Sequence, residues 1–145
     1  MISVSGKYDT DIITLFHATG DFNFRNRWME GVKKVEEIDH YLPRVGMRCR
    51  CLFENGESII YSTSYTYQDD KIEFSETDEK QKNATYFKLE KMNDNKVKLT
   101  LDYYLEQNKL AELYFTLFKK KKMQAALERS LLNLQEAVKE IKLTG

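Results

Sequence analysis

Alternating apolar and polar residues dominate the first two thirds of the chain and predict a series of β-strands. The clearest example is the segment 44–54, where every odd position from 45 to 53 is apolar and three of the even positions are arginine. Because successive side chains of a strand point to opposite faces, this segment predicts a strand with one apolar face. The dipeptide Asn55-Gly56 then predicts a tight hairpin turn into a second strand over residues 57–68.

The same alternation predicts further strands at residues 2–8, 32–40, 71–76, 84–92 and 96–105. Residues 12–20 follow Asp9, Thr10 and Asp11, which are all good N-cap residues, and predict a short helix. Residues 21–28 predict a second short helix or a 3₁₀ turn that ends at Trp28. Short turns between the later strands imply an antiparallel sheet with one covered face and one face in water.

The chain ends with a helical pattern over residues 108–143. From Met123 to Ile141 the apolar residues recur at steps of three and four, which places them on one side of a helix. Such a helix must bury its apolar side, and the sheet offers the large apolar surface that it needs. Four lysines, Lys119–Lys122, interrupt the pattern. We therefore expect the sheet to grip residues 123–141, and residues 110–118 to border the entrance of a pocket.

Composition narrows the class of protein. With 145 residues, of which 41% are hydrophobic, the chain is predicted to fold as a single domain over residues 1–145. Basic and acidic residues both number 23, so the net charge gives no reason to expect a nucleic-acid partner. Cys49 and Cys51 lie along one face of a strand, a poor geometry for a disulfide, and we expect two reduced thiols. The polar N-terminus and the lack of a long apolar run then predict a cytoplasmic protein.

Candidate catalytic and metal-binding residues are few. The two histidines, His17 and His40, lie in different predicted elements, and no Cys/His spacing typical of a metal site is present. We therefore predict no metal and no cofactor. Asp102 and Glu76 could act as a general acid or base if they were buried, but alternation places Asp102 on the outer face. No catalytic residue is assigned.

Several short motifs occur in order along the whole chain: Ile2–Gly6, Asp21, Trp28, Gly31-Val32, Val35-Glu36, Arg44-x-Gly46, Asn55-Gly56 and the run Leu127–Leu134. In this order they resemble the START/polyketide-cyclase/pollen-allergen superfamily, known as SRPBCC or helix-grip proteins. The resemblance implies an α+β fold with a curved antiparallel sheet of about seven strands wrapped around a long C-terminal helix. Two short helices follow the first strand. Members include lipid carriers, hormone-binding proteins, polyketide cyclases and chaperone activators, so the fold does not determine the function.

A cavity between sheet and helix is the site that these patterns predict. If odd-numbered strand positions face inward, the walls are mainly apolar with a few hydroxyl groups, which is typical of a ligand pocket. Trp28 could wall the pocket or act as a core anchor, and the tyrosines could instead lie at the rim. The residues predicted to contact a ligand are Trp28, Cys49, Cys51, Tyr61, Thr63, Tyr65, Phe87, Leu101, Tyr103, Leu117, Met123 and Leu127.

The predicted function is binding, with transport or sensing as its possible purpose, of a small hydrophobic or amphipathic ligand, and binding is favoured over catalysis. Two alternatives stay open: an enzyme of the polyketide cyclase or dehydratase type, and a protein-interaction module like the chaperone activators. An anionic membrane surface could contact Lys119–Lys122 and the apolar residues before them, but a solvated bend is the favoured interpretation.

Overall fold

The computed structural model describes residues 1–38, 47–54, 56–80, 82–93, 95–105, 114 and 118–144. The secondary structure elements begin with strand β1 and a group of three short helices. They continue with six further strands and end with a long helix, α4. In order, they are β1 (Ile2–Tyr8), α1 (Ile12–Gly20), the 3₁₀ helix η1 (Phe22–Phe24), α2 (Arg25–Trp28), β2 (Lys34–Glu37), β3 (Arg48–Phe53), β4 (Gly56–Gln68), β5 (Lys71–Asp78), β6 (Ala84–Asn93), β7 (Lys96–Tyr104) and α4 (Lys120–Thr144).

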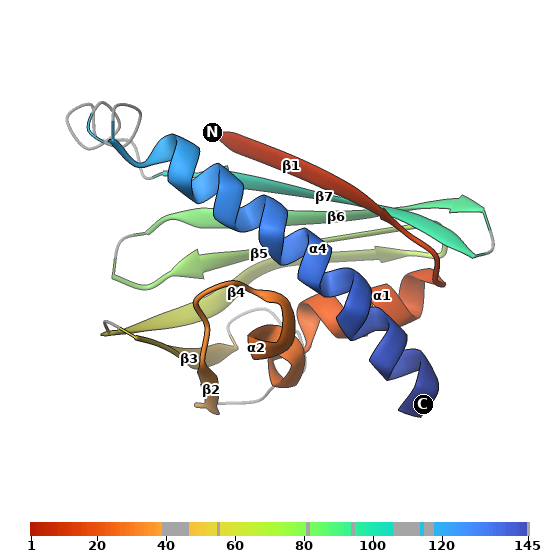
Figure 1. Cartoon of the computed structure of the whole chain (residues 1–145), viewed down its shortest axis with the longest axis horizontal. Helices are drawn as coiled ribbons and strands as arrows, with labels where there is room; N and C mark the ends of the chain where they lie inside the picture. The colour runs from red at the N-terminus through yellow and green to blue at the C-terminus, as the bar shows by residue number, and fades with distance from the viewer. Residues whose placement is uncertain are drawn as a thin grey trace.

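The seven strands form one antiparallel sheet in the order β1-β7-β6-β5-β4-β3-β2. Helix α4 crosses one face of this sheet diagonally, and the short helices α1 and α2 lie at one end of the same face (Figure 1). This arrangement confirms the predicted α+β helix-grip fold. The hairpin between β3 and β4 is also confirmed, because Phe53 pairs with Gly56, although Asn55 lies outside the described residues.

Local signals in the sequence explain how the short helices begin and end. Asp11 caps α1, since its Oδ2 accepts a hydrogen bond of 3.0 Å from the backbone N–H of Thr14. After α2 the chain reverses at Gly31, whose φ of +89° is a conformation that glycine adopts without steric cost. The turn is then attached to α4, because Ser130 Oγ accepts a hydrogen bond of 2.8 Å from the N–H of Glu30.

The apolar side of α4 packs mainly against β1, α1 and α2. Leu127, Leu131, Leu134 and Val138 are all buried in the core, which confirms the helical period predicted between Met123 and Ile141. Tyr8 of β1 donates a buried hydrogen bond of 2.8 Å to the carbonyl oxygen of Leu131. Residues 108–113 and 115–117, which the sequence also placed in this helix, lie outside the described residues. Because α4 is held beside β1, space remains over the middle strands near its first turn.

A β-bulge at Thr63 corrects the predicted orientation of β4. Ser62 lies opposite Glu76 and Ser64 lies opposite Ser75, so Thr63 is an extra residue between them. Before the bulge the even positions face inward, and Ser62 is buried while Tyr61 lies on the convex face. The prediction that Tyr61 and Thr63 face inward is therefore wrong. One inserted residue reverses the alternation, and the sequence pattern does not reveal it.

Strand β5 is longer than predicted. It continues past Glu76 to Asp78, because Thr77 and Asp78 pair with Tyr61 and Ile60 of β4. The extension brings a second acidic residue onto the inner face of the sheet, since Asp78 and Glu76 share one orientation. It also places the β5–β6 turn beside the β3–β4 hairpin, where the cavity described below is located.

Candidate functional site

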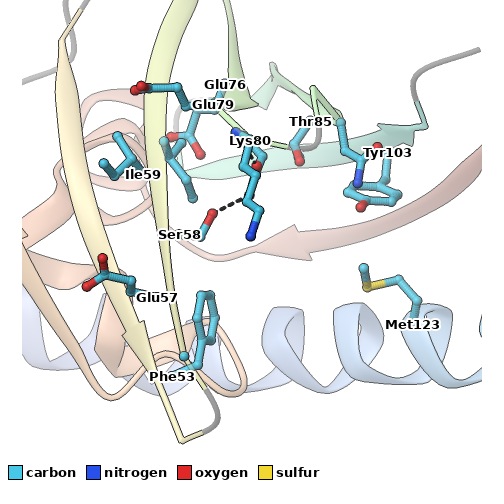
Figure 2. A pocket seen from close by; sticks show the side chains of 14 residues that line it. Phe53, Glu57, Ser58, Ile59, Glu76, Glu79, Lys80, Thr85, Tyr103 and Met123 are labelled. Atoms are coloured by element: carbon cyan, nitrogen blue, oxygen red, sulfur yellow. Dashed lines mark hydrogen bonds between the residues drawn. The ribbon is translucent and has the colours of Figure 1, made fainter.

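A cavity of about 780 Å³ lies between the inner face of the sheet, the β3–β4 hairpin and the first turn of α4. Figure 2 shows side chains of β4, β5, β6 and β7 around the cavity, with Met123 approaching from the helix. Its volume falls within the range of pockets that hold small organic molecules. The cavity is lined by Phe53, Gly56, Glu57, Ser58, Ile59, Ile60, Glu76, Asp78, Glu79, Lys80, Asn83, Thr85, Tyr103 and Met123.

A row of four polar side chains crosses the sheet, and three of them, Glu76, Thr85 and Tyr103, form the floor of this cavity. Tyr103 lies opposite Thr85, Thr85 lies opposite Glu76, and Glu76 lies opposite Ser62, so the row crosses four neighbouring strands. Directly opposite residues in an antiparallel sheet point to the same face, which gathers these groups on the inner side. The adjacent row, by contrast, is apolar and includes Phe87 and Phe74, whose rings stack at 4.4 Å.

Glu76 is held in place by a buried ion pair with Arg25 of α2. Nη1 of Arg25 donates to Oε1 of Glu76 at 2.7 Å, and Nη2 donates to Oε2 at 2.6 Å. Both residues are at most 5% exposed. Nη2 also donates to the carbonyl oxygen of Thr19 at 2.9 Å, which links the pair to the end of α1. Two parallel hydrogen bonds between charged groups fix the direction of the carboxylate at the cavity floor.

Aromatic rings surround the guanidinium group of Arg25. Its Cζ lies 4.8 Å from the ring centre of Phe22, 5.3 Å from Trp28 and 5.5 Å from Phe87. Burial by itself lowers the pKa of Arg25, but the charge and the hydrogen bonds of Glu76 outweigh it, so the pKa is raised. Arg25 therefore stays charged, and Glu76 always has its counter-ion.

Asp78 is the second carboxylate of the cavity, and the β5–β6 turn determines its position. Its Oδ1 accepts a hydrogen bond of 2.9 Å from the N–H of Lys80, and its Oδ2 accepts one from the hydroxyl group of Ser58. These bonds attach Asp78 to both the turn and β4.

Tyr103 faces the carboxylates from β7. Burial raises the pKa of its phenol, a hydrogen bond with Asn83 lowers it, and the charge of Asp78 raises it, with a net increase. The hydroxyl group therefore remains protonated at neutral pH and can donate or accept a hydrogen bond. Phe53 and Met123 contribute apolar surface away from these groups (Figure 2), and Ile60 contributes an apolar side chain next to Asp78. The cavity thus has one side rich in hydrogen-bonding groups and one apolar side.

Two of the twelve predicted ligand contacts, Tyr103 and Met123, line this cavity. Four others, Trp28, Phe87, Leu101 and Leu127, belong to the core. Trp28 is 1% exposed and its Nε1 donates a hydrogen bond of 3.0 Å to the carbonyl oxygen of Ala18. The interpretation of Trp28 as a core anchor is therefore confirmed, and Trp28 does not line the cavity described above.

The remaining predicted residues lie elsewhere. Cys49 and Cys51 are free thiols on the inner face of β3 with no exposed surface, and burial raises their pKa values to about 12 and about 11. Tyr61 lies on the convex face, where Lys82 Nζ is 5.7 Å from its ring centre, and Thr63 is the bulge residue. Tyr65 faces inward but contacts Phe16 of α1 at the far end, with ring centres 5.6 Å apart. Leu117 lies outside the described residues.

Several cavity residues were not predicted, and some of them had a signal in the sequence. Glu76 follows Ile72 and Phe74 at the same parity, and Thr85 precedes Phe87 and Leu89, so alternation alone places both on the inner face. Arg25 had no such signal, because it lies in a helix of four residues whose direction depends on the neighbouring elements. Asp78 lies beyond the end of the strand predicted at residues 71–76, so alternation gave no orientation for it.

No group of three or more His, Cys, Asp or Glu side chains is arranged to hold a metal ion in the described part of the chain. Within the same ranges, no helix is both long enough and apolar enough to cross a membrane.

Comparison with known proteins adds information on the fold. No protein-family model matches the sequence, and no curated protein matches it. Among solved structures, the hypothetical protein jhp0584 of Helicobacter pylori is similar with a TM-score of 0.78 and 9% identity, over 94% of this chain and 86% of that one. KanY is similar with a TM-score of 0.72 and 9% identity, over 94% of this chain and 95% of that one.

A third similar structure is DynU16, a protein of the dynemicin biosynthetic locus. The TM-score is 0.60 with 12% identity, and the match covers 95% of this chain but 46% of DynU16, so this chain spans about half its length. At such identities the three structures share the fold with this chain, and fold similarity alone does not transfer an activity. The function must be argued from the cavity itself.

Proposed function

We propose that the cavity binds a small amphipathic molecule. The observation that carries this proposal is the two-sided lining of a cavity of about 780 Å³. An apolar part of the ligand would lie against Phe53 and Met123. Polar groups of the ligand would lie against Asp78 and Tyr103. Apolar walls supply most of the binding free energy in such pockets, and a few polar groups orient the ligand.

The polar side favours a ligand that donates hydrogen bonds. Carboxylates accept hydrogen bonds and do not donate them, so Asp78 suits a hydroxyl or amine group better than a carboxylate. Glu76 is neutralised by Arg25, whereas Lys80 is the basic residue that lines the cavity. An anionic ligand would approach Asp78 at a cost, because like charges repel in a partly dry site. We therefore expect neutral or cationic ligands to bind better than anionic ones of the same size.

A matched pair of ligands tests whether the cavity binds amphipathic molecules and whether it prefers neutral head groups to anionic ones. Decanol and decanoate have the same chain and differ in the head group, and each can displace the neutral fluorescent probe N-phenyl-1-naphthylamine from the purified protein. We expect saturable probe binding, and displacement by decanol at roughly tenfold lower concentration than by decanoate, which corresponds to about 1.4 kcal/mol.

The variant Asp78→Asn provides the control. Its amide oxygen can still accept the hydrogen bond from Lys80 N–H and its NH₂ group can donate to Ser58, so the turn is preserved while the charge is lost. The preference for decanol over decanoate should then shrink. Absence of saturable probe binding to the folded protein contradicts the proposal. An unchanged preference in Asp78→Asn contradicts the role of Asp78.

A second candidate function is an enzyme of the polyketide cyclase or dehydratase type. It is supported by the convergence of Glu76, Asp78 and Tyr103 around one cavity, and by the similarity of the fold to that of a protein from a biosynthetic locus. Such a reaction needs an acid or base that touches the substrate, and Asp78 is the candidate because both carboxylate oxygens of Glu76 are bonded to the buried Arg25. Turnover of polycarbonyl substrates that disappears in Asp78→Asn, with probe binding retained, would favour this candidate over simple binding.

We also propose that the chain belongs to the SRPBCC superfamily and acts in the cytoplasm. The helix-grip fold and the order of short motifs support the family, and two buried free thiols support a reducing compartment. Labelling of cells that express the tagged protein, followed by fractionation, tests the compartment.

A further inference from the structure

An exposed basic and aromatic patch lies at the start of α4. It consists of Tyr114, Phe118 and the lysines Lys119–Lys122, and is called the α4 patch below. Tyr114 is 54% exposed and Phe118 is 69% exposed, although both are large apolar side chains. Their ring centres are 5.1 Å apart, so they form one exposed aromatic unit instead of two scattered residues. An apolar unit of this kind, bordered by charge, is typical of a contact surface.

The lysines give the patch a strong positive charge. Nζ of Lys119 lies 5.4 Å from the ring centre of Tyr114, so charge and aromatic surface are in direct contact. In the part of the chain that the structure describes, no ion pair involves Lys119–Lys122, and no acidic residue lies in the first turn of α4. Positive charge at a helix start is unfavourable for the helix, so the lysines do not stabilise α4. Their charge is available for an external anion.

We propose that the α4 patch docks on an anionic lipid surface. Aromatic rings enter the boundary between head groups and acyl chains, while lysines next to them attract the anionic head groups. Both components are present within nine residues, and their side chains are exposed except that of Lys120, which is half-buried. Charge complementarity selects an anionic bilayer over a zwitterionic one, and the aromatic pair selects a bilayer over a soluble polyanion.

The α4 patch lies next to the cavity, at the same end of α4. Met123 follows the lysines directly in α4 and lines the cavity. Docking through Phe118 and the lysines would bring the helix end of the cavity to the lipid surface, where amphipathic molecules concentrate. The proposal goes beyond ligand binding and does not depend on it, because vesicle binding is measured without any added ligand.

The experiment is sedimentation of the full chain with vesicles of phosphatidylcholine alone or with added phosphatidylserine. We expect binding to the anionic vesicles, weakening as salt is added, because screening reduces attraction to the head groups. Replacing all four lysines by glutamine should reduce the partition coefficient by at least about 100-fold, since each lysine near such a surface contributes about fivefold or more. Phe118→Ser should reduce it by roughly tenfold.

Two control variants lie further along the same helix. Leu132→Ser removes an equally exposed apolar side chain, since Leu132 is 64% exposed, and Lys139→Gln removes one exposed lysine. Neither should alter vesicle binding, and circular dichroism should show that every variant is folded. The proposal is overturned if the protein binds both kinds of vesicle equally well. It is also overturned if Leu132→Ser reduces vesicle binding as much as Phe118→Ser does.

If a second copy of this chain or a soluble polyanion binds the α4 patch instead of a lipid surface, the same purified variants give different results. A dimer in size-exclusion chromatography that Phe118→Ser dissociates would assign the patch to a second copy of this chain and overturn the lipid assignment. Binding to heparin that needs the lysines, together with vesicle binding that Phe118→Ser leaves unchanged, would make the patch a general polyanion site and overturn it as well.

Discussion

Arg25 and Glu76 are 51 residues apart in the sequence and form a two-hydrogen-bond ion pair in the interior, with N–O distances of 2.7 and 2.6 Å. The pair joins α2 to β5 and directs Glu76 toward the cavity floor. Its two members depend on each other, because a single charge left in this aromatic surrounding would have no counter-ion. The ion pair thus connects the stability of the fold to the shape of the candidate site.

Removing one partner of this pair should destabilise the protein more than removing both. Arg25→Met leaves Glu76 charged in the interior and should lower the free energy of unfolding by about 3–5 kcal/mol. The double variant Arg25→Met/Glu76→Leu replaces both charges by apolar groups and should recover most of that loss. Urea denaturation measures both values.

Arg27→Met is the matched control for this cycle. Arg27 lies in the same short helix, but it is exposed and its ion pair with Glu140 is 3.6 Å long and solvated. Its removal should change the free energy of unfolding by less than about 1 kcal/mol. A double variant as unstable as Arg25→Met alone would contradict the interpretation of the pair as mutually dependent charges.

Two neighbouring leucines of α4 should respond differently to the same substitution. Leu131 is 5% exposed and packs in the core, whereas Leu132 is 64% exposed. Leu131→Asp buries an unpaired charge at a cost on the order of 5 kcal/mol, which is comparable to the total stability of a small domain. We expect Leu131→Asp to be unfolded by circular dichroism and Leu132→Asp to be folded with a nearly unchanged Tm. Folded Leu131→Asp would show that α4 is not gripped as described.

Stability should decline in mildly alkaline solution because of the buried cysteines. Their pKa values of about 12 and about 11 lie above the ordinary value of 9.0, so the unfolded chain loses these protons first. As pH rises above the unfolded pKa, the folded state binds more protons than the unfolded state, and the free energy of unfolding falls. The slope should reach up to about 1.4 kcal/mol per pH unit for each thiol.

The variant Cys49→Ala/Cys51→Ala tests the origin of this slope. Alanine does not titrate, so the decline between about pH 8.5 and about pH 10 should flatten, whatever stability the variant loses at neutral pH. Urea denaturation at several pH values gives the comparison. An equal slope in the variant would assign the decline to other groups.

Filling the cavity should block probe binding without unfolding the protein. Thr85 lies on the cavity floor between Glu76 and Tyr103, so Thr85→Trp would place an indole ring in the space that a ligand needs. We expect at least tenfold weaker binding of N-phenyl-1-naphthylamine, on the order of 1.4 kcal/mol. Lys88→Trp, on the opposite face of the same strand, should bind the probe like the original chain. Equal binding by both variants would place the probe outside this cavity.

Much of the fold follows from local patterns. Asp11 begins α1, Gly31 reverses the chain after α2, and the spacing from Met123 to Ile141 predicts the gripped part of α4. These features depend on the conformational preferences of single residues or on a period of a few residues, so the sequence carries them directly. The antiparallel pairing of the later strands, from β3 to β7, also follows, because short turns join them in sequence. The pairing of β1 with β7 does not follow from any turn.

The candidate site was predicted less well, because its geometry depends on the whole sheet. Tyr103 and Met123 were predicted from alternation and helical period, and both line the cavity. The alternation on β4 was misread, because the bulge at Thr63 reverses which side chains face inward. Bulges depend on pairing with a partner strand, and one strand does not reveal them.

By itself, the sequence determined the helix-grip arrangement, the apolar side of α4 and the presence of an inner sheet face. The tertiary structure decided which polar groups meet on that face. Arg25 reaches Glu76, and Ser58 reaches Asp78, because α2 and two distant hairpins are brought together around the sheet. Contacts between residues far apart in the chain are set by how all the elements pack together, and no local pattern encodes them.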